Sequence, residues 1–202
     1  MRAMLTAVLF LAGLSVAQAQ EALPRDEALK AAFQLCRDLP KMLDTPIPTD
    51  PDVKRPVGVH ADKRGLMILP ESKLSLDAVA KAGPDAVSIG QLWLLRIAPV
   101  VGGQPAKAEQ MHMVSFSGGS GDNENVTVAL CALGVRKGAD GRPELLVYGK
   151  DKGPLLHVAL TPISDKQQNP IEVSAEQQGD GAMLTLKILG KFTAGFAVGT
   201  AE

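Results

Sequence analysis

The chain has 202 residues, with 21 Lys and Arg against 22 Asp and Glu, so it is nearly neutral at pH 7. This balance excludes the basic surface with which proteins bind nucleic acids or anionic lipids. Aromatic residues make up only 3% of the chain, which argues against the stacked aromatic platforms that bind single-stranded nucleic acid or carbohydrate.

Residues 1–19 have the pattern of a cleavable export signal. Arg2 precedes an apolar stretch from Met4 to Val16, and the small residues of Ala17-Gln18-Ala19 form a typical cleavage site. The apolar stretch is shorter than the roughly 20 residues that a transmembrane helix needs. We therefore expect a periplasmic or secreted protein, with no stable membrane insertion after the signal is removed.

Residues 20–43 are expected to form an N-terminal helical arm. Apolar residues recur three and four positions apart over Glu21–Leu39, as on one face of an amphipathic helix, and Pro40 marks its end. Residues 44–56 are rich in proline, which fixes φ and removes backbone donors. They are expected to be an extended linker to a β-rich globular domain of residues 57–199.

The β-rich domain is predicted from short apolar runs separated by glycine- and proline-rich turns. One short helix, Ser75–Ala82, is expected between a serine N-cap and the stop signal Gly83-Pro84. The predicted strands are Val57–His60, Leu66–Leu69, Ile89–Ile97, Val126–Val135, Glu144–Tyr148, Leu155–Thr161, Ile171–Ala175, Met183–Leu189 and Phe192–Val198. The fold class is therefore mainly β, an antiparallel sandwich or a partly open barrel, with an N-terminal amphipathic helix and one short internal helix.

Turn signals predict some of the strand pairing. Gly138–Gly141 and Lys150–Gly153 separate three strands between Val126 and Thr161, which favours an antiparallel meander. An Asp-Gly pair at Asp180-Gly181 between two alternating runs favours a β-hairpin.

Two cysteines in an exported protein suggest a disulfide. Cys36 lies on the apolar face of the expected helix and Cys131 in a predicted strand, so this bond would attach the arm to the sheet. Two separate buried thiols are the alternative, since a disulfide needs Cα atoms within about 7 Å.

Met111-His112-Met113 is the strongest candidate metal site, because thioethers and imidazole are ligands that suit Cu(I). On a strand the two methionines project to one face and His112 to the other. A copper site would therefore combine Met111 and Met113 with a histidine from elsewhere, His157 or His60. The alternative is that both methionines fill gaps in the core.

The loop of residues 115–125 does not match a catalytic motif. In Gly118–Asp122, aspartate stands where the nucleophile elbow of hydrolases requires glycine. Asp122, Glu124 and Asn125 offer oxygens for Ca²⁺, but the spacing is not that of an EF-hand, so a solvated turn is the preferred interpretation. Asn125-Val126-Thr127 matches a glycosylation sequon, which matters only in a eukaryotic host.

Three functional hypotheses follow. The first is a non-enzymatic exported β-domain that binds or scaffolds an unknown protein or another envelope or extracellular component, without a cofactor. The second is a periplasmic copper-binding protein that uses the Met-His-Met strand. The third is a hydrolase without a recognisable motif, formed by His60 or His112 with Asp62 or Asp122. The absence of catalytic motifs favours a non-enzyme, and the charge balance argues against a nucleic-acid partner.

Overall fold

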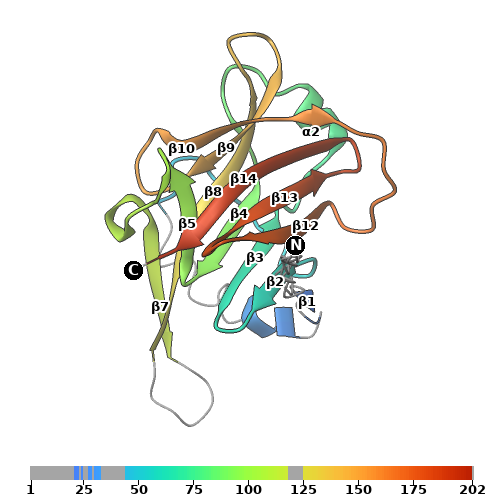
Figure 1. Cartoon of the computed structure of the whole chain (residues 1–202). Helices are drawn as coiled ribbons and strands as arrows, with labels where there is room; N and C mark the ends of the chain where they lie inside the picture. Colours follow the sequence, from blue (N-terminus) through green and yellow to red (C-terminus); the bar gives the residue numbers. More distant parts are fainter. Residues whose placement is uncertain are drawn as a thin grey trace, which may run out of the picture.

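A computed structural model of the chain shows two antiparallel β-sheets packed against each other (Figure 1). It describes residues 21–22, 24, 27–28, 30–32, 44–117 and 125–201. The predicted fold class, mainly β and antiparallel, is confirmed. Within these residues the outermost strands of the two sheets do not pair with each other, so the fold is a sandwich and not a closed barrel.

The larger sheet, called here the first sheet, has eight strands. In spatial order they are β1 (Glu21–Ala22), β2 (Val57–Ala61), β3 (Arg64–Pro70), β4 (Val87–Leu95), β8 (Asn125–Lys137), β9 (Pro143–Tyr148) and β10 (Pro154–Ala159), with β7 (His112–Ser117) also paired to β8.

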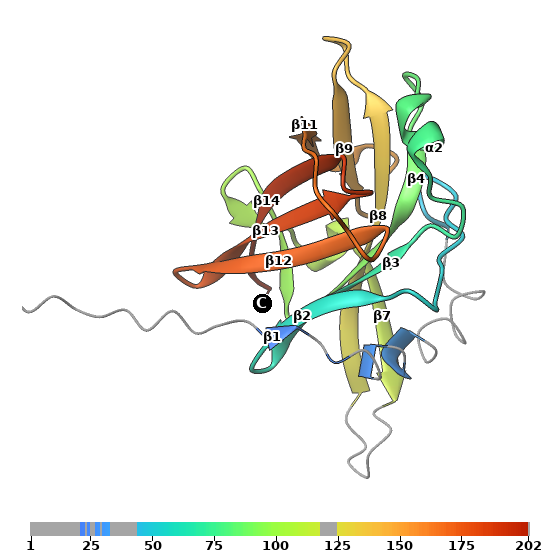
Figure 2. The same cartoon turned by 90° about the vertical axis from the view of Figure 1, so that its right-hand side faces the viewer.

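The second sheet has six strands. In spatial order they are β12 (Ile171–Gln178), β13 (Gly181–Ile188), β14 (Phe192–Thr200), β5 (Ile97–Val101) and β6 (Gln104–Pro105), with β11 (Thr161–Pro162) paired to β14. Figure 2 shows the strands β12 to β14 crossing β8 and β9 of the first sheet, as in sandwiches whose sheets pack orthogonally.

The expected internal helix is confirmed as α2 (Leu76–Ala80). The Ser75 hydroxyl oxygen caps it by accepting a hydrogen bond from the backbone N–H of Ala78 at 3.2 Å. A short 3₁₀ helix, η2 (Ala108–Gln110), precedes β7. In the described part of the chain, every helix is too short or too polar to cross a membrane.

The predicted meander and hairpin are confirmed. β8, β9 and β10 pair consecutively and antiparallel. β12 and β13 pair antiparallel on either side of Gly179 and Asp180, and Gly179 has the positive φ of 58° that this turn requires.

The chain passes from the first sheet to the second at Arg96. β4 ends at Leu95, β5 begins at Ile97, and Arg96 between them has φ of 58°. This left-handed residue redirects the backbone, so that β5 pairs with β14 in the second sheet. The prediction of a single strand over Ile89–Ile97 is therefore wrong at its end, where Ile97 begins a second strand. The sequence did not predict this division, because the run of apolar residues contains no signal for the change of direction.

A continuous apolar core lies between the two sheets. Leu92 and Leu133 of the first sheet and Leu184 and Leu186 of the second are fully buried members of one cluster. β14 is buried on one face only, since Phe196 lies in this core while its neighbours Gly195 and Ala197 are more exposed.

The outer face of the first sheet is also covered. Ala32 packs with Trp93 and Leu130, and Ile47 packs with Leu146. Residues 44–56, the predicted linker, lie against this face: the side-chain amide of Gln91 donates a hydrogen bond to the Thr49 hydroxyl at 2.7 Å.

The N-terminal arm differs from the prediction at its start. Glu21–Ala22 is a strand that pairs with Val59 and His60, not the first turn of a helix. Helical residues occur at 27–28 and 30–32, where the backbone N–H of Ala28 donates to the carbonyl of Pro24 at 3.0 Å. The remainder of the predicted helix, and the predicted signal of residues 1–19, lie outside the described residues.

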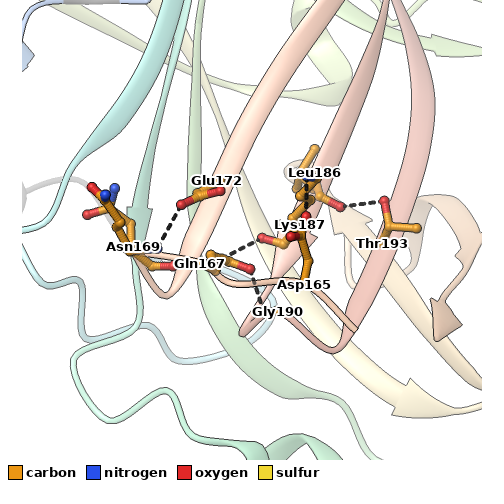
Figure 3. Close-up of polar contacts among 9 residues, drawn as sticks. Asp165, Gln167, Asn169, Glu172, Leu186, Lys187, Gly190 and Thr193 are labelled. Carbon is orange, nitrogen blue, oxygen red and sulfur yellow. Dashed lines mark hydrogen bonds and ion pairs between the residues drawn. The ribbon is translucent and has the colours of Figure 1, made fainter. Parts of the chain in front are cut away.

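The connection from β11 to β12 is fixed by one glutamine side chain (Figure 3). The amide nitrogen of Gln167 donates to the carbonyls of Asn169 and Lys187, at 2.6 and 3.0 Å. Its amide oxygen accepts from the backbone N–H of Gly190, and an ion pair between Lys187 and Asp165 lies beside it. These contacts hold the connection against the β13–β14 turn, so we assign the cluster a structural role.

Candidate functional site

The candidate site is an open pocket of about 610 Å³ at the base of the β7–β8 hairpin. We call it the methionine pocket. Most of its lining is apolar, including Leu94, Ile97, Ala106, Met111, Met113 and Ala129. Leu94, Ile97 and Ala129 belong to the core between the sheets, so the floor of the pocket is the edge of that core.

One wall of the pocket is the β5–β6 hairpin and the residues that follow it. Gly102 and Gly103 form the turn of this hairpin with φ of 60° and 84°, values that glycine adopts without strain. The backbone N–H of Ala106 donates to the carbonyl of Pro99 at 2.8 Å, and this bond continues the hairpin to the edge of the pocket.

The start of β7 and its partner β8 supply another part of the lining. Met111 follows η2 and is 3% exposed, whereas Met113 on β7 is 45% exposed. Met113 lies opposite Ala129 in the strand register, and residues opposite each other share a face of the sheet. The structure thus brings Met111 and Met113 to one pocket, with one side chain buried at the base and the other exposed at the mouth.

Two cationic residues, Arg96 and Lys107, also line the methionine pocket. Both are exposed. Among the described residues neither forms an ion pair, and none of the lining residues is acidic. Sequence reasoning missed both, because only the three-dimensional structure shows that residues before β5 and after β6 meet at one pocket.

His112 lies on the other face of β7, as its alternation with the methionines predicts. It lies opposite Leu130, which belongs to the cluster on the outer face of the first sheet. Burial, followed by the charge of Lys150, lowers the pKa of His112, and Asp44 opposes this shift. Its Nε2 atom is buried and makes no hydrogen bond with a described residue.

His157 is not brought to the two methionine side chains. It lies opposite Leu146, a residue of the outer face, whereas the methionines face the inner side. His157 Nδ1 is 3.3 Å from Glu144 Oε2, and Glu144 also pairs with Arg136. His60 lines a different, smaller pocket. The methionine pocket therefore has no histidine in its lining, and the expected set of Met111, Met113 and a histidine is not assembled.

Glu144, Arg136 and His157 form a small cluster of charged and titratable side chains. This cluster predicts that the stability of the protein depends on pH. Burial acts to raise the pKa of Glu144, but hydrogen bonds and charge from Arg136 and His157 hold it below its usual value. A lowered folded-state pKa contributes stability above the unfolded-state pKa, and this contribution is lost as the pH falls through the folded-state value. Glu144→Gln should therefore reduce the free energy of unfolding by up to about 1 kcal/mol at pH 7.

Urea unfolding at pH 7 and at pH 3 measures the difference in the free energy of unfolding between the native protein and Glu144→Gln. This difference should shrink toward zero at the lower pH. Glu176→Gln is the control, because Glu176 is exposed on β12 and has no ion pair with a described residue. Equal behaviour of the two variants at both pH values would contradict the assigned stabilisation.

The other predicted site residues do not converge in the described structure. No three His, Cys, Asp or Glu within it are placed to hold a metal ion. Asp62 lies in the β2–β3 turn with φ of 52°, while His112 is on β7. Residues 118–124, which include Asp122 and Glu124, lie outside the described residues. The Ca²⁺ hypothesis and the hydrolase pairs that use Asp122 therefore concern residues outside the described structure.

Cys131 is a free, fully buried thiol, and Cys36 lies outside the described residues, so the structure does not show the predicted disulfide. Cys131 belongs to the core between the sheets. Ala32, four residues before Cys36, packs on the opposite face of the first sheet. When a strand is buried on both faces, its sequence pattern does not indicate on which face a cysteine side chain lies.

We expect the Cys131 thiol to be unreactive in the native protein. Burial raises its pKa to about 12, so only about one part in ten thousand would be the reactive thiolate at pH 8. In an assay without reductant, a thiol-specific reagent should react with Cys131 only after the protein is unfolded. Failure to detect any thiol in the unfolded protein would show that both cysteines are oxidised.

No protein-family model, no curated protein and no solved structure matches the chain.

Proposed function

We propose that the protein is an exported, non-enzymatic β-domain that binds another envelope or extracellular component, and that the methionine pocket is its binding site. The observation that carries this proposal is the lining of the pocket, an apolar floor continuous with the core and an exposed methionine at the mouth. Concave, mostly apolar pockets with a few polar groups are the usual form of small-molecule sites.

Two further features support the proposal. Methionine side chains are flexible and polarisable, so they adapt to the shape of a bound apolar group. Export is supported by the signal pattern of residues 1–19, which would place the pocket outside the cytoplasm.

Copper binding is a second candidate, favoured by one specific observation. Met111 and Met113 line the same pocket, and thioether sulfur is a soft ligand suited to Cu(I). Two sulfurs without a histidine provide an incomplete ligand set, so apolar ligand binding remains the first proposal.

Fluorescence titration with the neutral apolar dye Nile red tests the first proposal. The purified protein should bind the dye at one saturable site, and Met113→Ser should weaken this binding. Val126→Ser is the matched control, because Val126 is on the same hairpin and 40% exposed, yet does not line the pocket. Absence of saturable binding, or equal weakening in both variants, would contradict the proposal.

The double variant Met111→Leu/Met113→Leu separates the two candidates. Leucine keeps the apolar lining and nearly the same volume but removes both sulfurs. Under the first proposal this variant retains dye binding. Tight anaerobic binding of Cu(I) by the native protein, lost in the double variant, would instead support the copper site.

A further inference from the structure

The charges of the methionine pocket specify its ligand further. We propose that the pocket binds an amphipathic anion, with the apolar chain against Met111, Met113 and the core residues beneath them, and the anionic head group at Arg96 and Lys107. This inference rests on the proposed function and names the ligand class of the same site.

Strand pairing brings the two cations to the same end of one hairpin. Val100 pairs with Pro105 and Val101 with Gln104, and the Ala106 to Pro99 hydrogen bond extends this pairing toward the open end. Arg96 precedes the hairpin and Lys107 follows it. Both cationic residues therefore belong to the open end of this hairpin and line an apolar pocket, a pattern complementary to a molecule that combines a charged group with an apolar chain.

Arginine stands at the position where the backbone turns from the first sheet into the second. Its φ of 58° lies in the left-handed region, which glycine and asparagine adopt more readily than arginine does. No ion pair within the described residues offsets this strain. Strained non-glycine residues cluster at functional sites, and a guanidinium group is well suited to bind carboxylate or phosphate.

A second pocket also contains two cationic residues, but acidic residues accompany them there. A cleft of about 660 Å³ between residues 54–58 and 168–173 also contains two cations, Lys54 and Arg55. In that cleft Arg55 is paired with Asp52 at 2.6 Å, and Glu172 lines the wall. The acidic residues there compensate the cations, whereas no described acidic residue lines the methionine pocket; Glu109 of η2 is nearby in sequence but is not part of the lining.

Displacement of Nile red by compounds with the same eight-carbon chain tests the inference. Octanoate and octyl phosphate should displace the dye at concentrations about fivefold lower than octanol, because an ion pair with an exposed cation contributes up to about fivefold in affinity. Octyltrimethylammonium should be the weakest competitor. The ranking of octanoate against octyl phosphate distinguishes a carboxylate from a phosphate head group.

The double variant Arg96→Gln/Lys107→Gln should remove the advantage of the anions over octanol and leave octanol unchanged. Arg142→Gln is the charge control, since Arg142 lies in the β8–β9 turn outside the pocket and should leave the advantage intact. Circular dichroism and thermal unfolding check that the double variant is folded. If the double variant is not folded, the single variant Lys107→Gln is used, because it leaves the left-handed residue Arg96 unchanged. Lys107→Gln should reduce the advantage of the anions over octanol.

The outcomes separate this inference from the proposed function. If Nile red binds and octanol competes as well as octanoate, the pocket binds apolar ligands but the inferred anion preference is wrong. If the cationic competitor is the strongest, the inference is also overturned. If Nile red shows no saturable binding, the proposed function fails.

Discussion

Replacing Gly90 with alanine is expected to destabilise the protein by at least about 3 kcal/mol, since it combines backbone strain with overpacking. Gly90 has φ of 144° and lies at a register shift in β4. A Cβ atom there would lie within 2.2 Å of the carbonyl oxygen of Leu69. β4 pairs with β3 on one side and β8 on the other, so its backbone has no free direction in which to move.

Gly65→Ala is the matched control in the same sheet. The nearest atoms to a Cβ at Gly65 are 3.5 Å away, an ordinary van der Waals distance, so the loss should stay below about 1 kcal/mol. Urea unfolding followed by the fluorescence of Trp93, the only tryptophan of the chain, measures both variants. Equal losses, or no loss for Gly90→Ala, would contradict the packing of β3 against β4.

Leu92→Ala should cost about 2 to 5 kcal/mol, the usual range for removing a buried leucine side chain. Leu92 is 0% exposed and belongs to the core between the two sheets. In the strand register it lies between Ile68 of β3 and Cys131 of β8. Its truncation leaves a cavity between the two sheets, where the strands on either side of β4 are held by backbone hydrogen bonds and have little freedom to collapse.

Leu76→Ala provides the comparison for this cost. Leu76 is 41% exposed at the start of α2, so its replacement should change the free energy of unfolding by no more than about 0.5 kcal/mol. The same urea titration gives both values. A small effect of Leu92→Ala would show that the two sheets do not pack through this residue.

Local sequence signals predicted the elements that depend on local physics. Ser75 and Gly83-Pro84 predicted α2, because a cap and a stop act within a few residues. The Asp180-Gly181 pair predicted the β12–β13 hairpin for the same reason. These elements needed no knowledge of their distant partners.

Features that depend on the direction of the chain were not predicted. The left-handed conformation of Arg96 divides one apolar run between two sheets, and no residue type there indicates it. Glu21–Ala22 forms a strand only because β2 lies beside it, whereas its sequence pattern favours a helix.

The candidate site was predicted in part. The alternation of Met111, His112 and Met113 correctly separates the methionines from the histidine, because it follows from strand geometry alone. The suggested partner His157 lies on the wrong face, since face and register across four strands cannot be deduced from spacing. Arg96 and Lys107 carry no motif at all, and only hairpin pairing brings them to the pocket.

The most direct test of the central claim is NMR spectroscopy of the protein labelled with ¹³C at the methionine methyl groups, titrated with octanoate. The signals of Met111 and Met113 should shift together and saturate with a single affinity, because both side chains line the proposed site. Met67, on the outer face of the first sheet, and Met183, on β13, should not shift with them. Saturable shifts at Met67 or Met183 with none at Met111 and Met113 would place the ligand elsewhere and contradict the account.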